Sequence, residues 1–324
     1  MPITGRINTG MEQTVPVVGG VNIDVGGRSF APLVGKDSNP GKVTVSLGGV
    51  GRNIAHNMSL LGIRVSLLTA IGDDAFSGKV TEACRENGID LSCAVRIPGG
   101  ATSVYLYLND SSGDMALAVS DMEICDRITP AYLASQLSLL QSAPLVVADA
   151  NIPEESIVWL AEHCEKPLFA DCVSTKKAEK LRSSLGRIHT LKANRLEAEL
   201  LSGIAVTDDQ SLLAAAQALL VTGLRRVFIS LGAAGLFASD GKSMLRCASY
   251  PAKVRNAGGA GDALMAALAV CYLQGLTLED TCRRATAAAS LAIESEETIN
   301  PAMSAEAVRK RAEAIPPAVN LYIS

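Results

Sequence analysis

The sequence predicts an α/β protein: a three-layer α/β/α sandwich with a mostly parallel sheet and a small lid of β-strands. From Thr129 onward, short apolar segments alternate with helical segments, a pattern typical of parallel strands joined by right-handed crossover helices. Two strand-rich regions nearer the N-terminus, 26–47 and 96–120, interrupt this alternation and are expected to form the lid. The chain has 324 residues, of which 48% are hydrophobic, so it can bury a large core on both faces of such a sheet.

The first third of the chain contains the first core elements and the predicted lid. Residues 15–21 form an apolar run that predicts a buried strand, and a helix is expected to begin near Arg52. Gly62 stands where a glycine commonly ends a helix. The other elements expected here are a strand over 65–70, a helix over 75–87 and a β-hairpin made by 103–108 and 115–119.

The remaining two thirds predict a regular succession of strands and helices. Thr129-Pro130 and Pro153-Glu154 indicate helix starts, because proline is well tolerated in the first helical turn. The other elements expected are strands at 145–148, 167–170, 188–191 and 227–231, and helices over 261–273 and 278–293.

Composition limits the classes of function. No linker or internal repeat divides the chain, so we expect a disordered leader over 1–13 and a single domain over 14–324. The sequence shows no apolar stretch of membrane-spanning length and no secretion signal, so a cytoplasmic protein with no membrane partner is expected. A net charge of −4 argues against a nucleic-acid partner, and eight scattered cysteines lack metal-ligand spacing.

A glycine-rich turn before an apolar helix is the first candidate for chemistry. Gly258-Gly259-Ala260-Gly261 has almost no side chains to block a ligand, and the free N–H groups of a first helical turn favour an anion such as a phosphoryl group. Asp262 follows and can accept a proton from an attacking hydroxyl. An ordinary helix N-cap is the alternative for Asp262, and spacing alone leaves the two interpretations even.

Polar side chains near the first strand are candidates for binding a substrate. Asn22 and Asp24 come after the apolar run, at the expected carboxyl end of a strand, where open α/β sheets bind ligands. Asn53 follows a second glycine cluster, Gly48-Gly49-Val50-Gly51, which permits close approach of the backbone. An Asx turn at 22–24 is an equally good alternative, and a glycine cluster alone is a weak signal.

Two further motifs follow predicted strands in the second half. Asn194 and Glu197 lie three residues apart, hence on one helical face, and can organise phosphate oxygens and a water-coordinated Mg²⁺. A capping box that only stabilises the helix is the alternative. Ser230, Gly232 and Gly235 end a strand and suit either nucleotide phosphates or a simple β-turn.

Taken in order, these motifs resemble the ribokinase-like pfkB family of carbohydrate and nucleoside kinases, over about residues 15–301. Family members carry Asn-x-Asp, Gly-Gly-x-x-x-Asn, Asn-x-x-Glu and Asp-Thr-x-Gly-Ala-Gly-Asp. Counterparts here are residues 22–24, 48–53, 194–197 and 259–262. The resemblance implies a ribokinase-like sandwich that uses ATP and Mg²⁺ to phosphorylate a hydroxyl group of a small sugar or nucleoside.

The resemblance also implies a role for each motif residue. Asp262 would be the general base, and the N–H groups of Gly259, Ala260 and Gly261 would form the anion hole. The other implied contacts are Asp24, Gly49 and Asn53 to the sugar, beside Asn22 and Gly48; Asn194 to phosphate and Glu197 to Mg²⁺ through water; and Ser230, Gly232, Gly235, Gly259 and Gly261 to ATP.

Two positions depart from the family pattern. Asn256 stands where relatives usually have Asp, and Ala257 replaces the usual Thr. In relatives these positions help to bind an activating K⁺ ion, and the loss of a carboxylate weakens a site for a hard cation. The resemblance therefore leaves potassium dependence in question.

Within the family, segments 37–42, 48–55, 147–152 and 189–197 are most similar to bacterial pseudouridine kinases, which act on the 5′-hydroxyl of a C-linked uracil nucleoside. A uracil-like base needs several polar partners. The side chains expected to contact the substrate from the lid side are Ser38, Asn39, Thr102, Tyr105 and Asp121, with Asn151 as a further contact.

Three other functions are compatible with parts of this pattern. The first is another kinase of the same family, acting on ribose, a hexose or an ordinary nucleoside. The second is a sensor that binds nucleotide and sugar without chemistry, against which the intact Gly259–Asp262 segment argues. The third, an NAD-dependent enzyme, lacks a GxGxxG turn after the first strand. Exposed lid strands in this family often pair, so a homodimer through the lid is expected.

Overall fold

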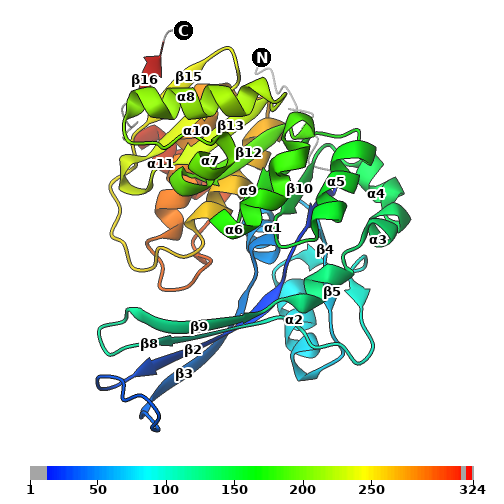
Figure 1. The fold of residues 1–324 in the computed structure, drawn as a ribbon, viewed down its shortest axis with the longest axis vertical. Helices are drawn as coiled ribbons and strands as arrows, with labels where there is room; N and C mark the ends of the chain where they lie inside the picture. Colours follow the sequence, from blue (N-terminus) through cyan, green and yellow to red (C-terminus); the bar gives the residue numbers. More distant parts are fainter. Residues whose placement is uncertain (1–12, 315–318, 323–324) are drawn as a thin grey trace, which may run out of the picture.

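The computed structural model describes residues 13–314 and 319–322 of the chain. Its described part consists of a large α/β body and a flat four-stranded lid that projects from one end of that body (Figure 1). The leader predicted over 1–13 lies, except for Gln13, outside the described residues. None of the helices within the described ranges is both long and apolar enough to cross a membrane.

The body is built on one ten-stranded sheet that is mostly parallel, as the sequence predicts. Strands β13 through β6 run parallel, whereas β14, β15 and β16 form an antiparallel edge that the sequence analysis did not anticipate. From one edge to the other the strands are β16 (Val319–Tyr322), β15 (Met244–Cys247), β14 (Leu236–Ser239), β13 (Arg226–Ser230), β12 (Thr190–Asn194), β11 (Leu168–Asp171), β10 (Val146–Asp149), β1 (Val15–Val18), β4 (Val65–Leu68) and β6 (Ile89–Asp90).

Helices cover both faces of this sheet and make the predicted three layers. One face holds α1 (Val50–Leu60), α2 (Ala75–Glu86), α9 (Ala260–Leu273), α10 (Leu278–Ala292) and α11 (Ala305–Ala314). The other holds α3 (Pro130–Ser135), α4 (Leu137–Ser142), α5 (Glu154–His163), α6 (Thr175–Ala178), α7 (Arg195–Ser202) and α8 (Asp209–Val221). Short 3₁₀ segments are η2 (Glu123–Arg127), η3 (Glu179–Arg187) and η4 (Gly232–Ala234).

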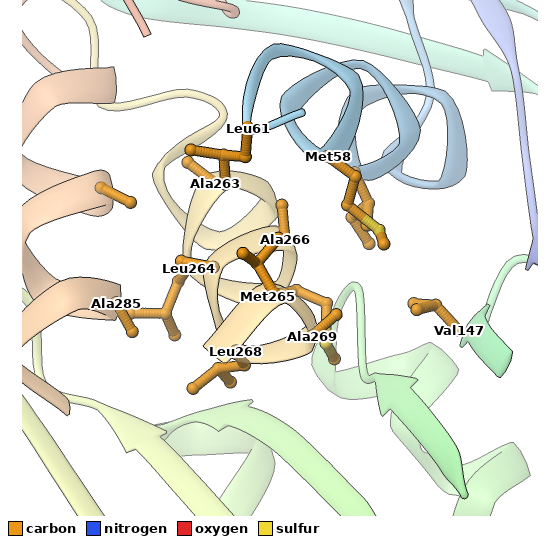
Figure 2. Packing of buried hydrophobic residues seen from close by; sticks show 14 of the residues in the cluster. Met58, Leu61, Val147, Ala263, Leu264, Met265, Ala266, Leu268, Ala269 and Ala285 are labelled. Carbon is orange, nitrogen blue, oxygen red and sulfur yellow. The ribbon is translucent and has the colours of Figure 1, made fainter. Parts of the chain in front are cut away.

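Each face of the sheet has its own hydrophobic core. Val147 of β10 packs into the core shared with α9, while its neighbours Val146 and Ala148 pack into the core on the opposite face. This alternation follows from the period of two in a strand, and it explains why the central strands are apolar throughout. α9 is buried from Asp262 to Cys271 and lies between α1 and α10 (Figure 2). The start of α9 is therefore fixed rigidly above the sheet.

The lid is a separate sheet in the order β3-β2-β8-β9. Its strands are β2 (Asn22–Ser29), β3 (Gly41–Gly48), β8 (Val104–Asn109) and β9 (Met115–Asp121). The predicted lid regions, 26–47 and 96–120, are thus shifted: β2 begins earlier, and 95–96 form β7 (Val95–Arg96), which pairs with β5 (Ala70–Ile71) outside the lid. Asn22 and Asp24 open the first lid strand, because β1 already ends at Val18, so their placement at the end of a core strand was wrong.

The two faces of the lid differ in character. Register pairing places Asp24, Ser46, Tyr105 and Ser120 in one row on one face. The opposite face is aliphatic, with exposed fractions between 39% and 68% for its outward side chains. These are Val43, Val45, Leu106, Leu108, Leu117 and Val119, which we call the aliphatic lid face.

Candidate active site

The start of α9 forms a loop of backbone N–H groups with an acidic side chain in its first turn. We call Gly258–Gly261 the anion loop. Gly259 caps the helix with a φ of 80°, a left-handed conformation that glycine adopts without strain, and a Cβ there would lie 2.2 Å from the carbonyl oxygen of Thr298. The helix therefore begins in a turn that only glycine fits, and its first N–H groups have no partner within the helix.

Asp262 is a buried carboxylate held by one amide. Asn53 of α1 donates a hydrogen bond from Nδ2 to Asp262 Oδ2 at 2.7 Å, and the two residues are 209 positions apart in sequence. Burial raises the pKa of Asp262 to about 7; the carboxylate of Asp171 adds to this rise, while Lys192 and the Asn53 hydrogen bond oppose it. A carboxylate with a pKa near neutrality is a stronger proton acceptor than an exposed aspartate.

Asn53 is positioned by the second glycine cluster. Gly49 has a φ of 96°, and a Cβ there would lie 2.5 Å from the carbonyl oxygen of Gly20, so the loop packs backbone to backbone. Arg52, which is buried, donates from Nε to the carbonyl oxygen of Gly48 at 3.3 Å and also bonds that of Leu47. The Oδ1 atom of Asn53 is buried and has no hydrogen-bond partner among the described residues. An acceptor left open beside Asp262 suits a ligand hydroxyl.

Asp24 lies next to this loop at the base of the lid. Asn22 donates from Nδ2 to Asp24 Oδ1 at 2.6 Å, and burial raises the pKa of Asp24. A Cβ at Gly48 would lie 2.4 Å from Asp24 Oδ2, so the glycine leaves room for this carboxylate. The predicted Asn22, Asp24, Gly48, Gly49 and Asn53 are thus brought together. They connect through the Asn53 bond to Asp262.

Asn151 follows β10 on the other side of Gly20. Its backbone N–H donates to Asp149 Oδ1 at 2.8 Å, and its side-chain oxygen accepts a hydrogen bond from Lys177. Asp149 also accepts from the N–H of Gly20 at 3.0 Å. A Cβ on Gly20 would meet Asn151 Nδ2 at 3.3 Å, which places Asn151 against the loop that leads from β1 into the lid.

Four of the residues predicted to bind nucleotide, Ser230, Gly232, Gly235 and Gly261, line one cavity behind the anion loop. Ser230, Gly232 and Gly235 share a cavity of about 530 Å³ with Ala260 and Gly261. Its other walls are largely apolar and include Leu236, Tyr250, Pro251, Leu264, Ala289 and Ile293. A mostly apolar cavity with a few polar groups suits a flat aromatic ligand, and its opening onto the anion loop suits an attached phosphate chain.

Asn194 and Glu197 form a capping box at the start of α7. The N–H of Glu197 donates to Asn194 Oδ1 at 2.9 Å, and the N–H of Asn194 donates to Glu197 Oε2 at 2.7 Å. The capping box, which the sequence analysis gave as the alternative to a ligand-binding role, is therefore present. Asn194 also lines a cavity of about 510 Å³ with Ser230 and Gly232, so the capping role and a position at the nucleotide site coexist.

The structure brings only one of the predicted lid-side residues to the Asp24 row. Tyr105 pairs with Asp24 in register and shares its face. Ser38 and Asn39 lie in the loop between β2 and β3, where Asn39 bonds the backbone of Val34. The remaining two are placed elsewhere: Thr102 bonds the α2 cap Asp74 through its N–H and hydroxyl, and Asp121 pairs with Val104 in a row on the opposite lid face.

Comparison with known proteins gives the family. The model of the pfkB family carbohydrate kinases matches residues 12–305, which include the elements described above from β1 to α10. The chain belongs to the pfkB family of carbohydrate kinases. It is 41% identical over 293 residues to a pseudouridine kinase of Escherichia coli (90% of this chain and 93% of the relative). It is 37% identical over 305 residues to an uncharacterized sugar kinase of the same organism, YeiI, covering 93% and 84%.

Solved structures agree on the fold of this pfkB kinase. A carbohydrate kinase from Agrobacterium tumefaciens superimposes with a TM-score of 0.82 at 27% identity, covering 96% of this chain and 100% of that one. An Arabidopsis thaliana ribokinase complexed with ribose and ATP has a TM-score of 0.82 at 22% identity, covering 93% and 99%. The ribokinase-like fold is thereby confirmed, and the chain is a phosphotransferase with a hydroxyl acceptor.

The segment before the anion loop of this pfkB kinase is closed by hydrogen bonds. Asn256 Nδ2 donates to the carbonyl oxygen of Glu296 at 3.1 Å, and Asn256 Oδ1 accepts from the N–H of Gly258 at 2.8 Å. The guanidinium of Arg255 pairs with the Glu296 carboxylate at 3.0 Å. Asn256 thus offers an amide in place of a carboxylate, and both its Nδ2 and its Oδ1 are already hydrogen-bonded, which does not favour a hard cation at this residue.

Three charged residues of this kinase were missed by the sequence analysis. Asp149, Asp171 and Lys192 lie at or near the carboxyl ends of the neighbouring strands β10, β11 and β12, and all three are buried. Lys192 Nζ and Asp171 Oδ2 are 2.9 Å apart. A sequence signal was present, because each charge interrupts or closes an apolar strand at the edge where parallel sheets bind ligands.

Proposed function

We propose that this kinase transfers the γ-phosphoryl group of ATP to the 5′-hydroxyl of pseudouridine and forms pseudouridine 5′-phosphate. The single observation on which this depends is the Asn53–Asp262 hydrogen bond, because it sets a buried proton acceptor at the junction of the sugar-side and nucleotide-side residues. The 41% identity to a pseudouridine kinase supports the choice of acceptor.

The chemistry assigned to the chain's own residues is positioning and proton transfer. Asp24 accepts hydrogen bonds from sugar hydroxyls, and Asn53 Oδ1 offers a further acceptor. The 5′-hydroxyl gives its proton to Asp262 as its oxygen attacks the γ-phosphorus, and the leaving diphosphate takes the electron pair of the broken P–O bond. The N–H groups of the anion loop stabilise the charge on the transferring group.

ATP is assigned to the cavity of about 530 Å³, with its base among the apolar walls and its phosphates toward Gly261. Mg²⁺, when bound to those phosphates, would offset their negative charge and polarise the transferring group. Mg²⁺ keeps most of its water ligands and needs few protein carboxylates, a requirement that buried Glu197 meets through water. Asn194 would hold a phosphate oxygen beside it.

A panel of acceptors tests the proposed function. ATP consumption is measured with pseudouridine, uridine, ribose and fructose at equal concentration, with the Asp262→Asn variant as the blank for each. We expect kcat/KM to be highest for pseudouridine, by at least about tenfold over uridine, because each base edge that is wrongly paired leaves a buried polar group unsatisfied. Faster turnover of ribose or fructose would overturn the choice of acceptor but not the kinase assignment.

A sugar is the second candidate acceptor, since the relative with 37% identity is described as a sugar kinase. Of the five side chains predicted to contact the base from the lid, Tyr105 alone lies on the Asp24 row. The same panel separates the two candidates. A Tyr105→Phe variant sharpens the result, because loss of the hydroxyl should lower kcat/KM only for an acceptor that reaches this row.

We infer that the kinase forms a homodimer through the aliphatic lid face. Its six outward side chains are well exposed and contiguous on three strands, as the pairing of Leu106 with Val119 and of Leu108 with Leu117 shows. Contiguous exposed aliphatic surface on a protein of this size usually marks an interface. A second copy of the same face is self-complementary about a twofold axis, and the six aliphatic side chains carry no charge, while Asp121 lies at the end of β9 on this face.

A further inference from the structure

A buried ion pair lies beneath the anion loop. Lys192 of β12 and Asp171 of β11 are Cα partners in the parallel register, and Nζ and Oδ2 are 2.9 Å apart. Their side chains are 9% and 1% exposed. A buried ion pair loses much of its hydration and contributes little net stability, so such a pair is weakly explained by folding alone.

The ammonium group of Lys192 lies directly against the anion loop. A Cβ at Gly261 would be 2.8 Å from Lys192 Nζ and 3.5 Å from its Cε. Gly261 does not have a positive φ, unlike Gly259, so its backbone conformation is open to other residues. The glycine at 261 is therefore explained by space: it allows the cation to touch the loop from the side of the sheet.

The same ammonium group is surrounded by carboxylates. The charges that interact electrostatically with the Asp262 carboxylate are those of Asp171 and Asp149 at the strand ends, Lys192 of β12 and Arg52 of α1. Burial and the two strand-end carboxylates raise the pKa of Asp262, and Lys192 and the Asn53 bond lower it. Burial works to lower the pKa of Lys192, but the neighbouring Asp171, Asp262 and Glu197 raise it overall, so the cation stays charged.

We propose that Asp171 and Lys192 are positioning residues for phosphoryl transfer: Asp171 holds the Lys192 ammonium group against Gly261, where its charge keeps the Asp262 carboxylate ionised and secures the anion loop. This rests on Asp262 being the general base, as in the proposed function. The proposal adds the Asp171–Lys192 ion pair to the groups on which the protonation state of Asp262 depends. Asp171 belongs to none of the motifs from which the function was inferred, and Lys192, which lies within segment 189–197, was given no role there.

The pH dependence of kcat/KM tests the proposal, because its acidic limb reports the pKa of the free enzyme's base. In the wild type the limb should lie near pH 7. Lys192→Met removes the attractive charge and should move the limb up by about one unit or more. Asp171→Asn keeps an oxygen that can accept from the Lys192 ammonium group but removes a repulsive charge, so it should move the limb down. The double variant should return toward the wild-type limb. Gly261→Ala, which displaces the ammonium group without removing a charge, should move it up.

The opposite signs separate positioning from a structural role. A pair that only stabilises the fold would lower activity in both single variants without moving the limb in opposite directions. Thermal melting and binding of a fluorescent ATP analogue confirm that each variant is folded, and Lys79→Met, a surface lysine bonded to a lid carbonyl, is the matched control with no expected shift. Limbs that shift together, or that do not shift in folded variants, would overturn the proposal.

A second readout keeps the test independent of the acceptor. The titration of Asp262 is followed by ¹³C NMR of carboxyl-labelled aspartate, with the Asp262→Asn spectrum identifying the resonance. The same upward shift for Lys192→Met and downward shift for Asp171→Asn are expected in the ligand-free enzyme. If no acceptor of the panel is turned over, the proposed function fails, while this titration still supports or overturns the role of the ion pair.

Discussion

At the start of α9 the polar groups around Asp262 are buried and bonded to one another, whereas the lid presents polar and aliphatic faces to solvent. Asn53 bonds Asp262, and Lys192 is paired with Asp171. The lid, by contrast, has outward side chains such as Leu117 and Val43 that are 60% and 68% exposed. The transfer site is preorganised, whereas the aliphatic lid face is left uncovered by the described residues.

This difference has a physical origin. The anion loop is anchored by α9, which is buried along most of its length between α1 and α10. The lid is a four-stranded sheet with no helix over its outer rows, and both β3 and β9 are edge strands. Preorganised groups stabilise a transition state without rearrangement, whereas an open sheet adapts to substrate or partner.

The largest expected effect is at the buried site. Asp262→Asn keeps the size of the side chain but removes the proton acceptor, so kcat should fall by about 10³-fold, within the range for loss of a general base. ATP binding should be unchanged within about twofold, because the N–H groups of the loop remain. Steady-state kinetics and titration with a fluorescent ATP analogue check the two expectations. Retention of more than a tenth of the wild-type kcat would contradict the role of Asp262.

The same substitution should not destabilise the protein at pH 8. The folded-state pKa of Asp262, about 7, lies above its ordinary value of 3.8, so the ionised carboxylate opposes folding above pH 7 and this cost disappears as the pH falls. Asp262→Asn should therefore raise the free energy of unfolding at pH 8 by up to a few kcal/mol, since one pKa unit corresponds to about 1.36 kcal/mol. Urea unfolding at pH 8 and pH 5 measures it; equal effects at both would contradict the buried charge.

The second effect lies at the junction of core and lid. Asp24→Asn retains the contact with Gly48 but loses a charged acceptor, and hydrogen bonds to charged groups contribute about 1.5–3 kcal/mol, so KM for the acceptor should rise by about 10- to 100-fold. kcat should change far less. Tyr107→Phe, two residues along the neighbouring strand, is a matched lid control with little expected change. A fall in kcat alone would place Asp24 in transfer instead of binding.

The contrast between the buried core and the open lid also explains which features could be predicted from the sequence. The core strands and helices were anticipated because apolar periodicity and caps are local: Thr129 caps α3 and Asn194 caps α7 as expected. The motif around Asp262 was found because a run of glycines before a helix indicates an anion site from the local sequence alone. The Asn53–Asp262 contact joins residues 209 positions apart, and only the resemblance to a family pointed to it.

The lid was predicted less well, for a physical reason. Which face of a strand binds a ligand depends on register, and a shift of one residue reverses the faces. Asp121 was assigned to the substrate side but pairs with Val104 on the other face, and Thr102 is used by the cap of α2. Asp171 and Lys192 were overlooked because their pairing depends on two strands being neighbours, which no local pattern states.

A smaller effect is expected from charges on the aliphatic lid face. Leu106→Lys with Val119→Lys places two cations at a directly paired position, so a lid-mediated dimer should dissociate to monomers. Thr44→Lys adds one positive charge to the opposite face and should leave the assembly unchanged. Sedimentation velocity of the wild type and both variants measures the mass. A monomeric wild type, or a dimer unaffected by the double substitution, would contradict the proposed interface.

The smallest expected effect concerns potassium, and it tests whether the buried site is complete without an added cation. Asn256 already bridges Gly258 and Glu296, so replacing KCl by tetramethylammonium chloride should change kcat by less than about twofold, since this residue offers no carboxylate to a cation. Asn256→Asp exchanges the amide donor for a carboxylate and should create a response to K⁺, seen in both kcat and the melting temperature. A wild type activated several-fold by K⁺ would contradict this prediction. The transfer site would then depend on an added cation and would not be complete with the described residues alone.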